Sequence, residues 1–109
     1  MNKVDLIGRV ATNIEVKECK NKKSYIRFRI AVNSFNGRER KTNFLNVVTW
    51  HGKTIEFLQK YISKGDLISL TGEIIEKRYE SEEGNIRYFT SIETKSINLL
   101  NKSKRKEIS

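Results

Sequence analysis

The sequence predicts an all-β fold, a small five-stranded Greek-key barrel with one short helix between its third and fourth strands. Long stretches alternate apolar and polar residues with the period of two that is typical of half-buried strands. One segment, residues 54–62, changes to helical spacing. The 109 residues suffice for a single domain with one core, and a five-stranded sheet of this size must close or cover its apolar face.

The first two strands are expected in residues 4–33. The first begins near Val4, can bend at Gly8, and continues through Val16. A polar, turn-like segment, residues 18–23, separates it from the second strand, SYIRFRIAVN, residues 24–33. Here the alternation is clean and gives the strand one apolar and one basic face. The apolar face holds Ile26, Phe28, Ile30 and Val32, and the other face holds Arg27 and Arg29.

The third strand and the helix follow. SFNGRERK, residues 34–41, is expected to form a loop that turns at its Asn-Gly pair. The third strand lies in TNFLNVVTWHGK, residues 42–53, which is rich in Val, Thr and aromatic residues. The helix then has Thr54 as its expected N-cap and Gly65 as its C-terminal stop.

Two more strands complete the pattern. The fourth covers residues 66–79 and contains Gly72, which can mark a bulge or bend. An acidic loop, residues 80–85, precedes the fifth strand, residues 86–100. This order of elements matches the oligonucleotide/oligosaccharide-binding (OB) fold, a five-stranded Greek-key barrel whose usual helix lies between the third and fourth strands.

The composition favours a polyanionic partner. There are 22 Lys and Arg against 13 Asp and Glu, for a net charge of +9. Nucleic acid is the partner that this charge balance favours, and an anionic membrane surface is an alternative partner. A solvated basic surface that binds no partner is the other alternative. No apolar run approaches the roughly 20 residues of a membrane helix, and the charged start is unlike a signal peptide. The single Cys19 excludes an intramolecular disulfide, so the cell interior is the default location.

Aromatic residues recur beside cations. In the third strand Phe44 and Trp50 share one face, roughly 20 Å apart at strand rise, which suits two separate bases of a bound strand. In OB barrels, bases stack on such rings at roughly 1–3 kcal/mol each. Each ring taken alone fits the core as well. Similar groups are Phe35 with Arg38 and Arg40, and Tyr79 with Lys77 and Arg78.

Five stretches point to a known family: NKVDLIGRV, FRIAVNSF, TNFLNVVTWHGK, FLQKYISKGDLISLTGEI and KRYESEEGNIRYFTSIE. Each is degenerate alone, but in this order and spacing the chain resembles the bacterial single-stranded DNA-binding protein family, from Met1 to about Leu100. The resemblance implies a non-enzymatic homotetramer that needs no cofactor. It would bind single-stranded DNA with little sequence preference during replication, recombination and repair, in the cytoplasm and associated with the nucleoid.

The resemblance also implies which residues bind DNA. The base-stacking aromatics of the family fall on Phe35, Phe44, Trp50 and Tyr79. Positions that look like backbone contacts are Lys53, Lys64, Lys77 and Arg78, with Arg38 and Arg40 in a loop of variable length.

The end of the chain departs from the family pattern. We expect an OB-fold single-stranded DNA-binding domain at 1–101 and a short basic tail at 102–109. Family members usually carry a flexible tail with an acidic, apolar tip that recruits partner enzymes, and such recruitment is not expected here, whether that tail was truncated or never present. The four cations of residues 102–106 either add nonspecific affinity or belong to a disordered, solvated end. The net positive charge is a second departure, because family members are often acidic.

Other functions fit parts of the pattern. The chief alternative is an OB-fold scaffold of a primosome-type complex that binds DNA weakly and docks partner proteins. An RNA chaperone and a small nuclease are further possibilities, but a nuclease needs a catalytic set that the sequence lacks. The one histidine, His51, is expected to be a polar surface residue, and no cluster of His, Cys and carboxylates has metal-ligand spacing.

Overall fold

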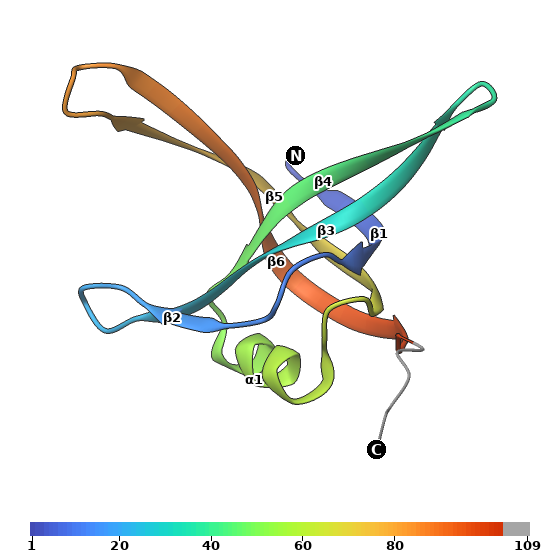
Figure 1. The fold of residues 1–109 in the computed structure, drawn as a ribbon. Helices are drawn as coiled ribbons and strands as arrows, with labels where there is room; N and C mark the ends of the chain where they lie inside the picture. The colour runs from blue at the N-terminus through green and yellow to red at the C-terminus, as the bar shows by residue number, and fades with distance from the viewer. Residues whose placement is uncertain (104–109) are drawn as a thin grey trace.

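The computed structural model describes residues 1–103 (Figure 1). The elements in chain order are β1 (Val4–Val10), β2 (Val16–Glu18), β3 (Ser24–Asn36), β4 (Glu39–Thr49), α1 (Gly52–Tyr61), β5 (Leu67–Glu80) and β6 (Ile86–Asn101). Most of the expected basic tail, residues 104–109, lies outside the described residues.

The strands form one sheet that closes on itself. Their order is β1-β5-β6-β4-β3-β2, and β1 also pairs with β3, so β1, β5, β6, β4 and β3 form a ring. All pairs are antiparallel except β4 with β6. In Figure 1, α1 lies below this ring, while the β3–β4 and β5–β6 hairpins extend beyond it in different directions. The predicted barrel, with its helix between the third and fourth barrel strands, is confirmed.

Two predicted boundaries in the strands are wrong. Residues 14–16 do not continue the first strand, because Val16 begins a separate short strand, β2, that pairs with β3. Residues 34–41 are not a loop, since pairing of β3 with β4 persists to Asn36 and Glu39. Only residues 37 and 38 turn, and the positive φ of Gly37, 69°, makes so short a connection possible.

The helix begins earlier than the sequence suggested. Its N-cap is His51, whose side chain makes no capping hydrogen bond, and Thr54 already lies in the first turn. The predicted stop, Gly65, comes after the helix has ended at Tyr61. Gly65 has a φ of 98° and donates its N–H to the carbonyl oxygen of Val10, so it turns the chain toward β5 rather than capping α1.

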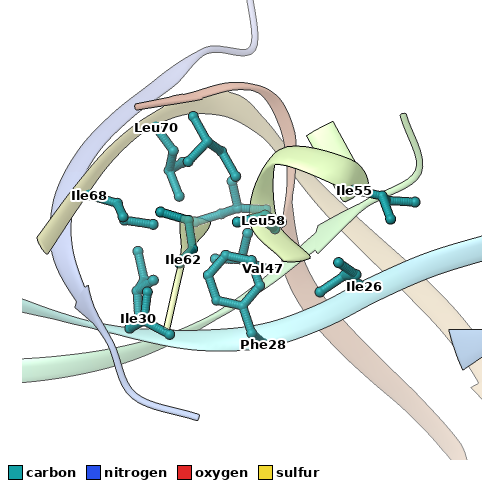
Figure 2. Close-up of a cluster of buried hydrophobic side chains, with 12 residues drawn as sticks. Ile26, Phe28, Ile30, Val47, Ile55, Leu58, Ile62, Ile68 and Leu70 are labelled. Atoms are coloured by element: carbon teal, nitrogen blue, oxygen red, sulfur yellow. The ribbon is translucent and has the colours of Figure 1, made fainter. Parts of the chain in front are cut away.

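The hydrophobic core fills the barrel and the space between the barrel and α1 (Figure 2). The predicted apolar face of β3 is confirmed, because Ile26, Phe28 and Ile30 are buried while Arg27 and Arg29 are exposed. The helix contributes to the same core through Ile55 and Leu58, which are buried together with Ile62 just beyond it.

Two glycines allow close strand approach. A Cβ on Gly8 would lie 2.7 Å from the carbonyl oxygen of Ala31, so a side chain there would push β1 away from β3. At Gly72 a Cβ would overlap the carbonyl oxygen of Glu93. The register of β5 with β6 shifts between Thr71 and Gly72, which confirms the predicted bulge.

A buried carboxylate holds the first two residues of the expected tail against the barrel. Asp66 accepts hydrogen bonds from Lys102 Nζ at 2.8 Å, Ser103 N at 2.7 Å and Ser63 N at 2.8 Å. Burial alone would raise the pKa of Asp66, but these hydrogen bonds and the charge of Lys102 outweigh it and lower the pKa below its ordinary value. Asp66 is therefore charged at neutral pH and ties the end of β6 to the start of β5.

Candidate nucleic-acid interface

The outer face of the β3–β4 hairpin carries three of the candidate residues, Phe35, Arg40 and Phe44, and Trp50 follows at its end. Because side chains alternate along each strand, the odd-numbered residues of β3 and their partners on β4 lie on the side opposite Ile26, Phe28 and Ile30. Of this set, Val48 is buried. We call this set the β3–β4 outer face. Its printed register pairs are Phe35 with Arg40, Asn33 with Thr42, Ala31 with Phe44, Arg29 with Asn46, and Arg27 with Val48.

Trp50 lies at one end of this face, directly after β4, and is half-buried. The ring of Tyr25 lies 4.9 Å from it between centroids, with an interplanar angle of 33°. Lys23 Nζ and Lys77 Nζ lie 5.7 Å and 5.8 Å from the Trp50 ring. Cations at this range are attracted to the negative face of an indole. Trp50 is therefore an edge residue with cationic neighbours and not part of the core.

Arg27 lies between the ring of Tyr25, which packs on Trp50, and the ring of Phe89. Its guanidinium carbon lies 5.8 Å from the ring centroid of Tyr25 and 5.2 Å from that of Phe89. Phe89 comes from β6, where it pairs with Lys77 of β5. Residues from β3, the end of β4, β5 and β6 thus meet at one place, which we call the Trp50 cluster. It consists of Lys23, Tyr25, Arg27, Trp50, Lys77 and Phe89.

Phe44 lies farther along the same face and is also open to solvent. Arg29 contacts it in two ways, with its guanidinium carbon 5.7 Å from the ring centroid and its Nη2 donating to the Phe44 carbonyl oxygen at 2.9 Å. The hydrogen bond fixes the cation beside the ring, so a base that stacked on Phe44 would find a positive charge next to it.

Phe35 and Tyr79 lie on the two hairpins. Phe35 has Arg40 5.8 Å from its ring near the tip of β3–β4, and Arg38 is exposed in the turn itself. Tyr79 is near the end of β5, two residues after Lys77 and therefore on the same face of that strand. Arg78 points to the opposite face, where it pairs with Tyr88, so the structure separates Arg78 from Tyr79.

The remaining predicted cations lie near the helix. Lys53 is exposed in the first turn of α1, three residues after Trp50. Lys64 is exposed in the connection between α1 and β5, and this connection is bonded to the end of β1 through Gly65. Neither residue belongs to the β3–β4 outer face.

Exposure settles whether the four predicted aromatics are core residues. The exposed fraction is 70% for Phe35, 53% for Phe44 and 53% for Tyr79, and Trp50 is half-buried. Each of these rings lies on a surface that also presents cations. The rings are thus available to a partner.

The sequence analysis did not single out five residues that the structure brings to this surface: Lys23, Tyr25, Arg27, Arg29 and Phe89. Arg27 and Arg29 were visible as the basic side of an alternating strand, and Tyr25 continues the same side, so the period of two could have found all three. Phe89 could be found only from the register of β5 with β6, which pairs it with Lys77.

The described residues offer no metal centre or membrane-spanning helix. Within residues 1–103, no group of three or more His, Cys, Asp and Glu side chains is arranged to hold a metal ion. In the same residues, no helix is both long and apolar enough to cross a membrane.

A small closed barrel with rings and cations on one outer face is the architecture of single-strand nucleic-acid-binding modules. The model of the Single-strand binding protein family matches residues 1–100, and the chain belongs to this family. Family membership makes it a binding protein and not an enzyme.

Curated relatives agree with this assignment. The chain is 40% identical over 102 residues to single-stranded DNA-binding protein 2 of Streptococcus agalactiae serotype V, a match that covers 91% of this chain and 76% of the relative. It is 33% identical over 109 residues to single-stranded DNA-binding protein 1 of Clostridium acetobutylicum, covering 95% of this chain and 97% of the relative.

Solved structures agree on the fold. The mitochondrial single-stranded DNA-binding protein of S. cerevisiae superimposes with a TM-score of 0.71 at 27% identity, covering 93% of this chain and 96% of that one. A Plasmodium falciparum SSB solved in complex with ssDNA superimposes with a TM-score of 0.83 at 21% identity, with the same coverage. At that lower identity the likeness supports the fold alone.

Proposed function

We propose that this chain binds single-stranded DNA with little sequence preference, and holds separated strands apart from nucleases and from re-pairing. The observation that carries the proposal is the outer surface itself, where accessible rings lie beside cations on a barrel of the single-strand binding family. Every base has a face that can stack on a ring, so such a surface tolerates sequence.

The bases would stack on the four exposed or half-buried aromatics, and the backbone would be neutralised by cations near them. The proposed stacking residues are Phe35, Phe44, Trp50 and Tyr79. The proposed phosphate contacts are Arg38, Arg40, Lys53, Lys64, Lys77 and Arg78. The positions of Lys64 and Arg78 away from the β3–β4 outer face would require the strand to wrap around the barrel.

The biological setting is part of the same proposal. Relatives named single-stranded DNA-binding proteins support the binding of single-stranded DNA. The proposed setting of this binding is replication, recombination and repair, in the cytoplasm and at the nucleoid. A homotetramer is the assembly typical of the family, and it would place several such surfaces on one particle.

The test is a titration of a labelled oligo-dT followed by fluorescence anisotropy at several salt concentrations. Affinity should fall with salt, with a log–log slope of about −0.7 for each phosphate contacted. A matched duplex should compete poorly because its bases are already stacked. An affinity independent of salt, equal competition by duplex, or saturation only by a matched RNA would contradict the proposal.

A further inference from the structure

A basic hollow lies beside the β3–β4 outer face, where the connection between β1 and β2 crosses β3. Its volume is about 410 Å³. Three cations and one carboxylate line it, Lys17, Arg27, Arg29 and Glu15, together with polar side chains that include Asn13 and Asn46. None of the three cations is among the phosphate contacts proposed above.

The backbone fixes the walls of this hollow. Ala11 N donates to the carbonyl oxygen of Arg29 at 2.8 Å, and Arg29 N donates to Thr12 Oγ1 at 3.0 Å. These two bonds hold the start of the β1–β2 connection against β3. The connection continues into β2, which pairs with β3 and brings Lys17 to the same side. The hollow is therefore a feature of the paired strands.

The positive charges in the hollow are not neutralised by ion pairs within the described residues and can bind an anion. Arg27 and Arg29 are two residues apart on one face of a strand, so their Cα atoms are separated by roughly 7 Å. Within residues 1–103, neither arginine nor Lys17 takes part in an ion pair. Arg29 uses Nη2 for the carbonyl of Phe44, and Arg27 only lies over two rings.

The position of the hollow indicates that the anion is a phosphate of a nucleic-acid backbone. Arg29 touches Phe44, and Arg27 belongs to the Trp50 cluster, so the hollow lies between the two aromatic sites of the outer face. A strand with one base on each site must run its backbone between them. Guanidinium groups match the geometry of phosphate oxygens and bind them strongly.

We propose that this hollow seats a backbone phosphate of the bound strand, held mainly by Arg27 with Arg29 and Lys17, between a base on Phe44 and a base on the Trp50 cluster. This inference rests on the proposed function and deepens it. Glu15 opposes the phosphate, and the three cations outnumber it.

Arg27→Gln is the cleanest test, because Arg29 also holds the backbone of Phe44. The salt slope is the slope of the logarithm of the binding constant against the logarithm of salt concentration. Loss of one phosphate contact should make this slope shallower by about 0.7 for each chain bound, and should raise Kd severalfold at low salt. The loss should be equal for oligo-dT, oligo-dC and oligo-dA, since a phosphate carries no sequence information. Arg27→Lys keeps the charge and should restore most of the slope.

The matched control is Lys60→Gln, which removes one positive charge from an exposed helix residue. It should leave the slope within error of the parent chain. If Arg27→Gln fails to fold by circular dichroism, Lys17→Gln on the exposed strand β2 is measured in its place, with the same expected loss of slope.

The outcomes separate this inference from the function on which it rests. If the parent chain binds and both Arg27→Gln and Lys17→Gln keep its slope, the phosphate seat is wrong and the proposed function stands. A loss of affinity that differs among the three oligonucleotides, with an unchanged slope, would mean that Arg27 contacts a base and would also overturn the seat. No binding by the parent chain would overturn both.

Discussion

The two faces of β3 are made by alternate residues of one strand, yet they differ in residue type and in burial. Ile26, Phe28 and Ile30 are buried in the barrel, while Arg27 and Arg29 between them lie outside against aromatic rings. One strand thus supplies both the core and the candidate interface. The inner face should control stability and the outer face should control binding, so substitutions one position apart should have separable effects.

The largest expected effect is on the inner face. Phe28→Ala should lower the free energy of unfolding by about 3–5 kcal/mol, because it removes a fully buried ring from a closed barrel. Urea unfolding measures this. Arg27→Gln, its exposed neighbour, should change stability by no more than about 0.5 kcal/mol. Similar losses from the two variants would contradict the division between the faces.

Asp66 gives the next largest effect, and one that depends on pH. Asp66→Asn should cost about 1.5–3 kcal/mol at neutral pH, since it weakens charged hydrogen bonds to Lys102, Ser103 and Ser63. The pKa of Asp66 is lowered by folding, so its contribution is present above the unfolded-state value of about 4 and is lost as pH falls through the folded-state value.

Urea unfolding of the parent chain and the Asp66→Asn variant from pH 7 to pH 2 checks this prediction. The two stabilities should converge as the solution becomes acidic. A difference in stability that stayed constant with pH would mean that the charge of Asp66 does not matter.

The outer face should show the reverse pattern. Phe44→Leu should weaken oligo-dT binding by about 1–3 kcal/mol, the usual value of one stacked base, and leave unfolding nearly unchanged. Tyr61→Leu is the control, because Tyr61 is exposed to nearly the same extent, but it lies on α1 and is not among the proposed DNA contacts. Anisotropy titration measures both, and equal losses would remove Phe44 from the interface.

The smallest expected effect is at the hairpin tip. Phe35→Leu should weaken binding by about 1 kcal/mol, the low end of the stacking range, because a ring this exposed is less well held in place before binding. The same titration measures it beside Phe44→Leu. A larger loss at Phe35 than at Phe44 would move the centre of the interface from the barrel toward the tip.

The comparison of the two faces also shows how much of the interface can be predicted from the sequence. The alternation of β3 is readable because one side is apolar and the other is basic. In β4 the consecutive residues Val47, Val48 and Thr49 are all buried, so its period does not say which side is outside. The exposure of Phe44 and Trp50 therefore had to come from the register with β3.

Other features depend on contacts distant in sequence. The charged residues around Asn36 and Gly37 looked like a loop because nothing local shows that they pair across a hairpin. Two of the three partners of Asp66, Lys102 and Ser103, lie 36 and 37 residues further along the chain. Spacing rules describe neighbours on one element and say nothing about such pairs.

The most direct test follows the fluorescence of Trp50, the only tryptophan, as oligo-dT is added at low and high salt. Stacking of a base beside the Trp50 cluster predicts strong quenching that saturates at a definite number of nucleotides per chain and weakens with salt. An unchanged signal while anisotropy reports binding would mean that DNA does not reach Trp50, and would contradict the assignment of the β3–β4 outer face as the DNA-binding surface.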